Sequence, residues 1–242
     1  MYKKLFKQVE QKKDTVDNFA KAKQLGRRVW HFLWHDDSML SWVANILLAF
    51  IIIKFIFYPV LGAILGSAFP VVAVVSESME HGLHEGEICG QEYDYFPNGF
   101  DNWWEVCGNW YTQEEIDISK EQFMDFPMHN GFNKGDIIVL WRANTNNIEL
   151  GDILVFQSSR SHPIIHRVVK VWTTENTLTG ELDYHYQTKG DHNVNSFSGV
   201  LGEQDITIDR VYGKALFRIP FLGYIKILFA ELLYFFGINI LV

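Results

Sequence analysis

Hydrophobic residues are concentrated in two stretches of the chain, one in its first third and one at its C-terminus. Between Trp42 and Val75 the only charged residue is Lys54. A helix needs about 20 apolar residues to cross a bilayer, so this run exceeds the length of one span. The pattern predicts a spanning helix at about residues 40–58, within a membrane anchor of residues 39–70.

The C-terminal stretch, residues 219–242, is apolar again, but Lys226 and Glu231 interrupt it. A second membrane span and an amphipathic helix in the membrane interface both fit this pattern. The uncharged final residues favour the span. The chain is therefore expected to cross the membrane once or twice.

The distribution of charge predicts the orientation of the anchor in the membrane. Residues 1–38 are polar and hold nine Lys or Arg against five acids, which predicts a cytoplasmic tail because basic residues stay inside. A cleaved signal peptide would be shorter and nearer the N-terminus. Everything after Val75 is then expected outside the cytoplasm. The anchor would lie in the cell membrane or, in a eukaryote, in the endoplasmic reticulum membrane.

Short β-branched runs dominate residues 71–218, and Gly-Asp turns open two of them. The runs cover residues 135–142, 151–157, 164–172, 184–191 and 205–215. Without a helical period between them, they predict a mainly β domain, an antiparallel sheet or partly open barrel. Asp136 and Asp152 are expected to make side-chain turns at strand starts, and Arg167 to extend from the sheet into solvent.

An acidic insertion, residues 80–134, interrupts this domain. Its twelve acids face only Lys120 and Lys134, within a chain of net charge -8, and such a balance argues against nucleic-acid binding. The insertion shows no sustained period and predicts one short helix at about residues 112–124. Three of its aromatic residues are expected in a small core or at the membrane interface: Trp103, Trp104 and Trp110.

The chain has two cysteines, Cys89 and Cys107, and both fall in the insertion. Disulfides persist outside the cytoplasm, so a bond between them is the first expectation. Two free thiols remain the alternative, because two cysteines do not establish a framework.

Candidate chemistry begins with VVSESMEHG, where Ser76 and Ser78 follow the anchor. A serine hydroxyl needs a base to become a nucleophile. His81 and His84 lack further ligands for a metal, so no metal site is predicted. His166 differs because it lies inside the apolar run PIIHRVV, where a structural buried histidine is the alternative to a base.

Six short motifs occur in a recognisable order: SESM at residues 76–79, GDIIVL, GDILVFQ, PIIHRVVKV, TKGDHN and YGKA. This series resembles the boxes of the type I signal peptidases, in the archaeal and endoplasmic-reticulum branch, where histidine stands before Arg-Val and the bacterial branch has lysine. The resemblance implies a membrane-bound serine endopeptidase that needs no cofactor. Ser78 would be the nucleophile, His166 the general base and Ser76 an oxyanion donor.

The third catalytic residue stays open. The acid usually found six residues after the Asp of the KGD box is absent, since Phe197 stands there. Asp191 is ranked first to orient His166 and Asp205 second, with Ser196 or Ser198 as weaker acceptors.

The resemblance also implies the partners. Secretory and membrane preproteins would be cut at the outer face of the membrane, after small residues at the first and third positions before the cut. Association with the translocation machinery is a further expectation. The alternative function is a non-catalytic, membrane-tethered binding or scaffold relative that keeps the motifs for folding.

Overall fold

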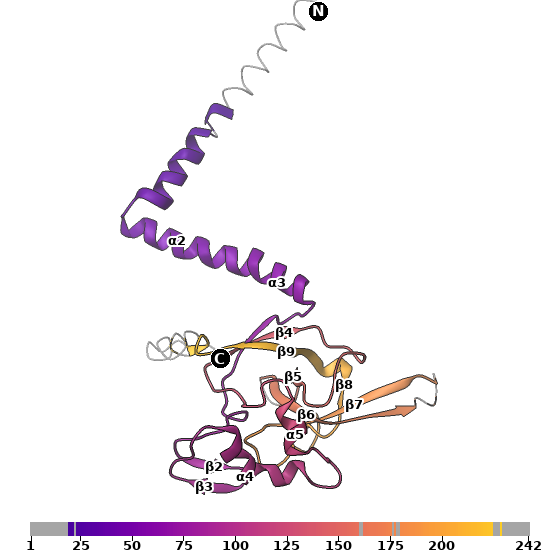
Figure 1. Ribbon diagram of the computed structural model, residues 1–242. Helices are drawn as coiled ribbons and strands as arrows, with labels where there is room; N and C mark the ends of the chain where they lie inside the picture. Colours follow the sequence, from indigo (N-terminus) through magenta and orange to yellow (C-terminus); the bar gives the residue numbers. More distant parts are fainter. Residues whose placement is uncertain are drawn as a thin grey trace, which may run out of the picture. The chain divides into compact units, whose positions relative to one another are not determined.

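The computed structural model describes residues 19–21, 23–159, 162–175, 177, 180–224 and 228 (Figure 1). The chain divides into two units, Met1–Val60 and Leu61–Val242. Most of the predicted C-terminal helix of residues 219–242 lies outside the described residues, and so do residues 1–18 and 22 of the basic tail.

One continuous helix, Met39–Leu65, is long and apolar enough to cross a membrane, and it is the one such helix in the described part of the chain. It comprises α2 (Met39–Ile52), a π-helical turn (Ile53–Phe57) and α3 (Tyr58–Leu65). The helix is longer than the predicted residues 40–58. Pro59 follows the π turn, which is where a widened turn relieves the clash between a proline ring and the preceding carbonyl groups.

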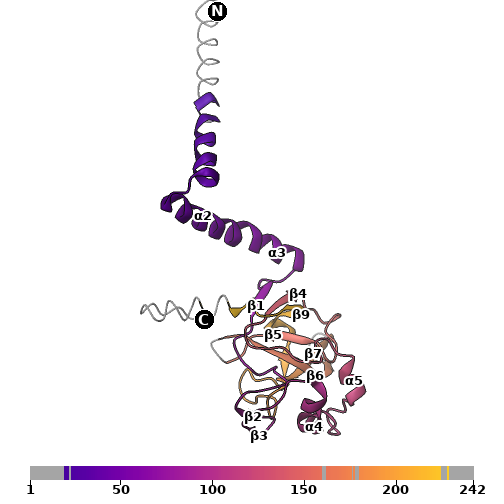
Figure 2. The ribbon, with the colours of Figure 1, turned by 60° about the vertical axis from the view of Figure 1, so that its left-hand side comes forward.

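Seven antiparallel strands form the main sheet of the second unit, which confirms the predicted mainly β fold (Figure 2). Their order across the sheet is β1-β4-β9-β5-β6-β7-β8. The bounds are β1 Val71–Ala73, β4 Ile137–Trp141, β5 Ile153–Phe156, β6 Ile164–Glu175, β7 Leu182–Lys189, β8 Ile206–Thr207 and β9 Val211–Ile219, with a 3-10 turn at Ile208–Arg210. Strand β1 is at one edge of the sheet, so one side of its backbone has no neighbouring strand in this order.

The two Gly-Asp strands, β4 and β5, lie on either side of β9. Asp136 accepts a hydrogen bond from the backbone N–H of Asn133 at 3.0 Å, and Asp152 accepts one from Glu149 at 2.9 Å. Each aspartate therefore closes the turn that precedes its strand, as the sequence predicted.

The insertion contains a hairpin, β2 (Gly86–Ile88) with β3 (Gln91–Tyr93), and the helices α4 (Phe100–Tyr111) and α5 (Lys120–Met124). The helix predicted at residues 112–124 is wrong over most of its length, because only its last five residues are helical. The main helix, α4, was missed. Its buried positions recur at helical spacing, at Phe100, Trp103, Cys107 and Tyr111, but interspersed Gly and Asn obscured this period.

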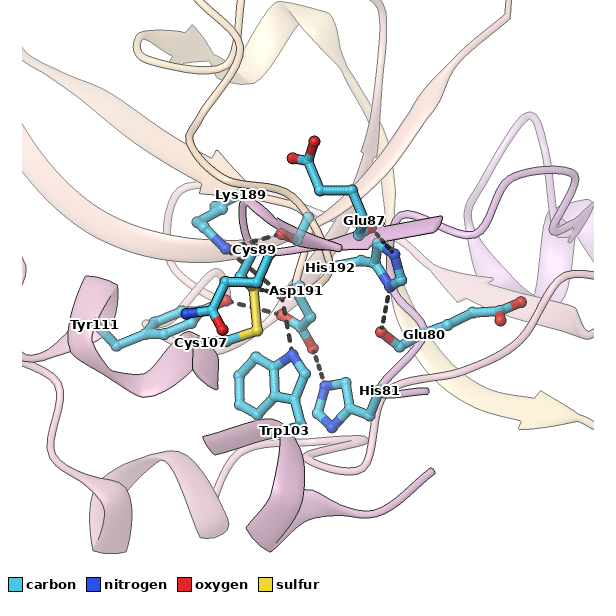
Figure 3. Close-up of a disulfide and its surroundings, with 12 residues drawn as sticks. Glu80, His81, Glu87, Cys89, Trp103, Cys107, Tyr111, Lys189, Asp191 and His192 are labelled. Carbon is cyan, nitrogen blue, oxygen red and sulfur yellow. Dashed lines mark hydrogen bonds and ion pairs between the residues drawn. A yellow bond between two sulfur atoms is a disulfide. The ribbon is translucent and has the colours of Figure 1, made fainter. Parts of the chain in front are cut away.

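Aromatic residues give the insertion its own core. Trp103 is completely buried, and its ring packs at 5.5 Å from Tyr111 and 5.0 Å from Phe123. Trp103 is thus a core residue, while Trp104 and Trp110 are partly buried against the same core. Cys89 and Cys107 form a disulfide that joins the turn after β2 to α4 (Figure 3).

Candidate active site

The serine loop, residues 74–80, follows β1 directly. The hydroxyl oxygens of Ser76 and Ser78 are 3.1 Å apart. The side chain of Met79 is completely buried, and its carbonyl oxygen accepts a hydrogen bond from the Phe132 N–H at 3.0 Å. The Ser78 carbonyl oxygen accepts another from the His192 N–H, also at 3.0 Å. Backbone contacts on both sides therefore hold Ser78 in place.

His166 lies on β6, opposite Leu154 of β5, and its ring is almost completely buried. Ring atom Nδ1 contacts Oε1 of Glu203. On the other side, Nε2 faces Gly190, where an added Cβ would lie 2.7 Å from Nε2 and 2.7 Å from the Ser78 carbonyl oxygen. Only glycine leaves room for the ring and the serine loop to approach each other at this point.

Ser76, Ser78, His166 and Asn193 line one pocket of about 500 Å³. The rest of its wall is mainly apolar and comes from β1 and the start of β6: Ala73, Val75, His162, Pro163, Ile164 and Ile165. A second pocket, of about 360 Å³, shares five of these residues and extends along β1 to Phe69. The structure therefore brings the two serines and the histidine singled out in the sequence to one end of an apolar groove.

Glu203, which the sequence analysis did not consider, is the carboxylate in contact with His166. It is completely buried. Its oxygens also accept hydrogen bonds from the Thr188 hydroxyl at 3.1 Å and the Phe197 N–H at 2.7 Å. Phe197 stands where the resemblance predicted an acid. The carboxylate bound to its N–H is that of Glu203, which comes later in the chain. The sequence did hold a signal for this residue, because Glu203 is the sole acid between Asp191 and Asp205.

Asp191 has other partners. Its carboxylate accepts hydrogen bonds from Arg167 at 3.0 and 2.8 Å, from His81 at 3.0 Å and from Tyr111 at 3.2 Å. Burial alone would raise the pKa of Asp191, but the Arg167 charge and these hydrogen bonds outweigh it and hold the pKa well below its usual range. The carboxylate first ranked for His166 is instead the centre of a buried ionic network.

Asp205, the second-ranked acid, also pairs with a different histidine. Its Oδ1 lies 2.7 Å from Nδ1 of His185 on β7. Ser196, a weaker alternative, accepts a hydrogen bond from Gln187 at 3.0 Å. The structure thus assigns the contact with His166 to Glu203 rather than to these residues.

Arg167 is completely buried, so the expectation that it extends into solvent is wrong. Two of its hydrogen bonds go to Asp191, and three go to the carbonyl oxygens of Pro127, Met128 and Gly151. A guanidinium group has five N–H donors, and this set satisfies all of them. Arg167 therefore joins β6 to the insertion and to the loop that carries Asp191.

Lys189 is the other buried cation near the site. Its ammonium group donates to the Gly190 carbonyl oxygen at 3.0 Å and lies 5.0 and 4.9 Å from the ring centres of Trp110 and Tyr111. Burial lowers the pKa of Lys189 to about 8, although Asp191 and Glu203 oppose the shift. Its hydrogen bond to the Gly190 carbonyl directs the ammonium group to the backbone of the TKGD turn.

Within the described ranges, no group of three or more His, Cys, Asp or Glu side chains is placed to hold a metal ion.

A hydroxyl, an imidazole and a carboxylate in this order form the arrangement on which serine hydrolases rely. No protein-family model matches the chain. It is similar to the signal peptidase complex catalytic subunit SEC11 of Fusarium vanettenii, with 32% identity over 108 residues, which cover 43% of this chain and 59% of that protein. The SEC11 subunit of Yarrowia lipolytica is 30% identical over 112 residues, covering 45% of this chain and 61% of the relative. Human SEC11C is 32% identical over 104 residues, covering 42% and 52%. The chain thus spans roughly half to three-fifths of the length of these relatives.

Proposed function

We propose that this protein is a membrane-anchored serine endopeptidase that removes signal peptides from secretory and membrane preproteins. Ser78 is the nucleophile, His166 the general base and Glu203 the carboxylate that orients the base. The observation that carries the proposal is the placement of His166, whose Nδ1 contacts buried Glu203 while its Nε2 faces the serine loop in a shared pocket. The similarity to signal peptidase catalytic subunits supports the choice of substrate.

The reaction needs one proton to move twice. Nε2 of His166 takes the proton of the Ser78 hydroxyl as the oxygen attacks the scissile carbonyl, and returns it to the leaving amine. Glu203 stabilises the imidazolium that forms between these steps. The Ser76 hydroxyl, beside the attacking oxygen, and the Ser78 N–H are the proposed donors to the oxyanion, and losing one such donor costs about 10²- to 10³-fold in turnover.

The apolar groove fits an extended peptide. Strand β1 has a free edge in the sheet order, so a substrate backbone can add to it as a further strand. Ala73, Val75 and Ile165 line the groove beside the serines, so the side chains next to the cut would meet an apolar wall. Small residues are expected at the first and third positions before the cleaved bond, because signal-peptide cleavage sites have this pattern.

The anchor accounts for the membrane-bound substrate. A signal peptide carries a short apolar segment that enters the bilayer, and the helix Met39–Leu65 holds the enzyme in the same plane. Ser78 follows the end of this helix by thirteen residues. We place the serine loop at the outer face of the cell membrane, or the lumenal face of the endoplasmic reticulum in a eukaryote, within a complex like that named for the relatives.

Processing of a test precursor by the purified chain in lipid vesicles decides between an enzyme and a binding protein. Ser78→Ala should abolish processing without changing membrane insertion, whereas the exposed Ser198→Ala control should process at the wild-type rate. Absence of processing by the wild type would leave the non-catalytic scaffold as the better account, and equal processing by wild type and Ser78→Ala would show that Ser78 is not the nucleophile.

A further inference from the structure

His192 connects the serine loop to the disulfide through its backbone. Its N–H donates to the Ser78 carbonyl oxygen at 3.0 Å, and its own carbonyl oxygen accepts from the Cys89 N–H at 3.0 Å. One residue therefore lies between the proposed nucleophile and the cysteine that is bonded to α4. A displacement of Cys89 would pass to Ser78 through two hydrogen bonds.

The side chain of His192 makes a second connection (Figure 3). Ring atom Nδ1 lies 3.0 Å from the carbonyl oxygen of Glu80, and Nε2 lies 2.8 Å from the carbonyl oxygen of Glu87. Glu80 is two residues after Ser78, and Glu87 lies on β2, two residues before Cys89. The ring thus ties the serine loop to the hairpin of the insertion.

Both ring nitrogens lie within hydrogen-bond distance of a backbone carbonyl oxygen, which can only accept. The ring therefore lies between the serine loop and the hairpin and can donate to either of them. A side chain without ring nitrogens would lose both contacts.

We propose that His192 is a positioning residue for Ser78: its backbone and its ring together fasten the serine loop to the disulfide-bonded insertion. This inference rests on the proposed function of Ser78. His192 is not among the residues that line the pocket, and none of the contacts described joins it to His166; its link to the pocket is the hydrogen bond to the Ser78 carbonyl oxygen. It acts through the position of the Ser78 backbone.

The first test requires no catalysis. In the inactive Ser78→Ala protein, a further His192→Ala change removes the ring but keeps the backbone N–H. At fixed pH, the amides of residue 192 and Cys89 should then exchange faster with solvent than in Ser78→Ala alone. Unchanged protection of both amides would overturn the proposal. This readout remains valid even if the protein proves not to be a peptidase.

The second test uses activity. His192→Gln offers one neutral amide donor, so kcat on a test precursor should fall on the order of 10- to 100-fold with little change in KM. The control His84→Gln, an exposed histidine of the same insertion, should keep the wild-type kcat and KM. An unchanged kcat in His192→Gln, or a loss that falls on KM alone, would contradict the role.

Discussion

His166 and Glu203 meet inside the domain through Nδ1 of the ring and Oε1 of the carboxylate, although 37 residues separate them in the sequence. This contact uses one ring nitrogen and leaves Nε2 directed at the serine loop. A histidine held in this way has a defined tautomer, which is what a general base next to a serine requires.

Replacing Glu203 with Gln should lower kcat by about 10²- to 10⁴-fold, because an amide can neither fix the required tautomer nor stabilise the imidazolium. The fold should persist, since the amide is close in size to the carboxylate. The matched change Asp205→Asn alters an acid that pairs with His185 and should leave kcat within about twofold. A large loss in Asp205→Asn with a wild-type rate in Glu203→Gln would assign the role to Asp205.

Asp191→Asn should act on folding. The change removes the anionic partner of buried Arg167, and breaking a buried pair in this way costs about 3–5 kcal/mol of unfolding free energy. Denaturant unfolding of the variant should show this loss, and activity should follow the folded fraction. A variant that keeps wild-type stability and is nevertheless inactive would show that Asp191 has a catalytic role.

Lys189 should make stability depend on pH at the alkaline side. Its pKa is about 8 in the folded protein and about 10.5 when the chain is unfolded, so the unfolded state binds the proton more tightly. The cost of burying the charged ammonium group lowers the free energy of unfolding in full below pH 8, and this effect disappears as pH rises to about 10.5. Lys189 therefore lowers stability at neutral pH. Lys189→Met should therefore gain stability relative to wild type at pH 7, and the gain should shrink by pH 10.

Unfolding free energies of both proteins across this range provide the measurement. The comparison is between two proteins, so other titrating groups, such as buried Tyr111, contribute equally to both. A difference that stays constant from pH 7 to pH 10 would show that Lys189 keeps its ordinary affinity for protons in the fold.

Loss of the disulfide should reach beyond the insertion. The bond closes a loop of 18 residues, which the chain-entropy model values at about 3 kcal/mol. Because the Cys89 N–H binds the His192 carbonyl, a Cys89→Ser and Cys107→Ser double variant should exchange amide hydrogens faster at residues 190–193 as well as within the insertion. Faster exchange confined to the insertion would show that the link to the serine loop is weak. Reductant should change the wild type but not the variant.

Local patterns accounted for much of the architecture. The apolar run before Ser78 predicted the long helix, and Gly-Asp turns with β-branched runs predicted the strands, because both signals lie within one element. Ser78 and His166 could be singled out as candidate catalytic residues because each stands in a distinctive short motif. The structure adds that both line one groove.

Glu203 could not be placed in the same way. Its contact with His166 depends on the loop after β7 folding back, with the Thr188 N–H bound to the Glu203 carbonyl at 3.0 Å. No short motif encodes such a long-range contact. Asp191 was ranked first for His166 because its motif is distinctive. Its carboxylate pairs instead with Arg167, which is buried although the sequence analysis expected it in solvent.

The most direct test of the Ser78, His166 and Glu203 assignment is covalent labelling with a peptidyl phosphonate, a serine-reactive electrophile with small side chains next to the reactive group. Mass spectrometry of the labelled wild type should locate the adduct on Ser78, and labelling should be slower in Glu203→Gln and slowest in His166→Ala, because each change weakens removal of the serine proton. An adduct on another residue, or equal labelling rates in the wild type and His166→Ala, would contradict the assignment.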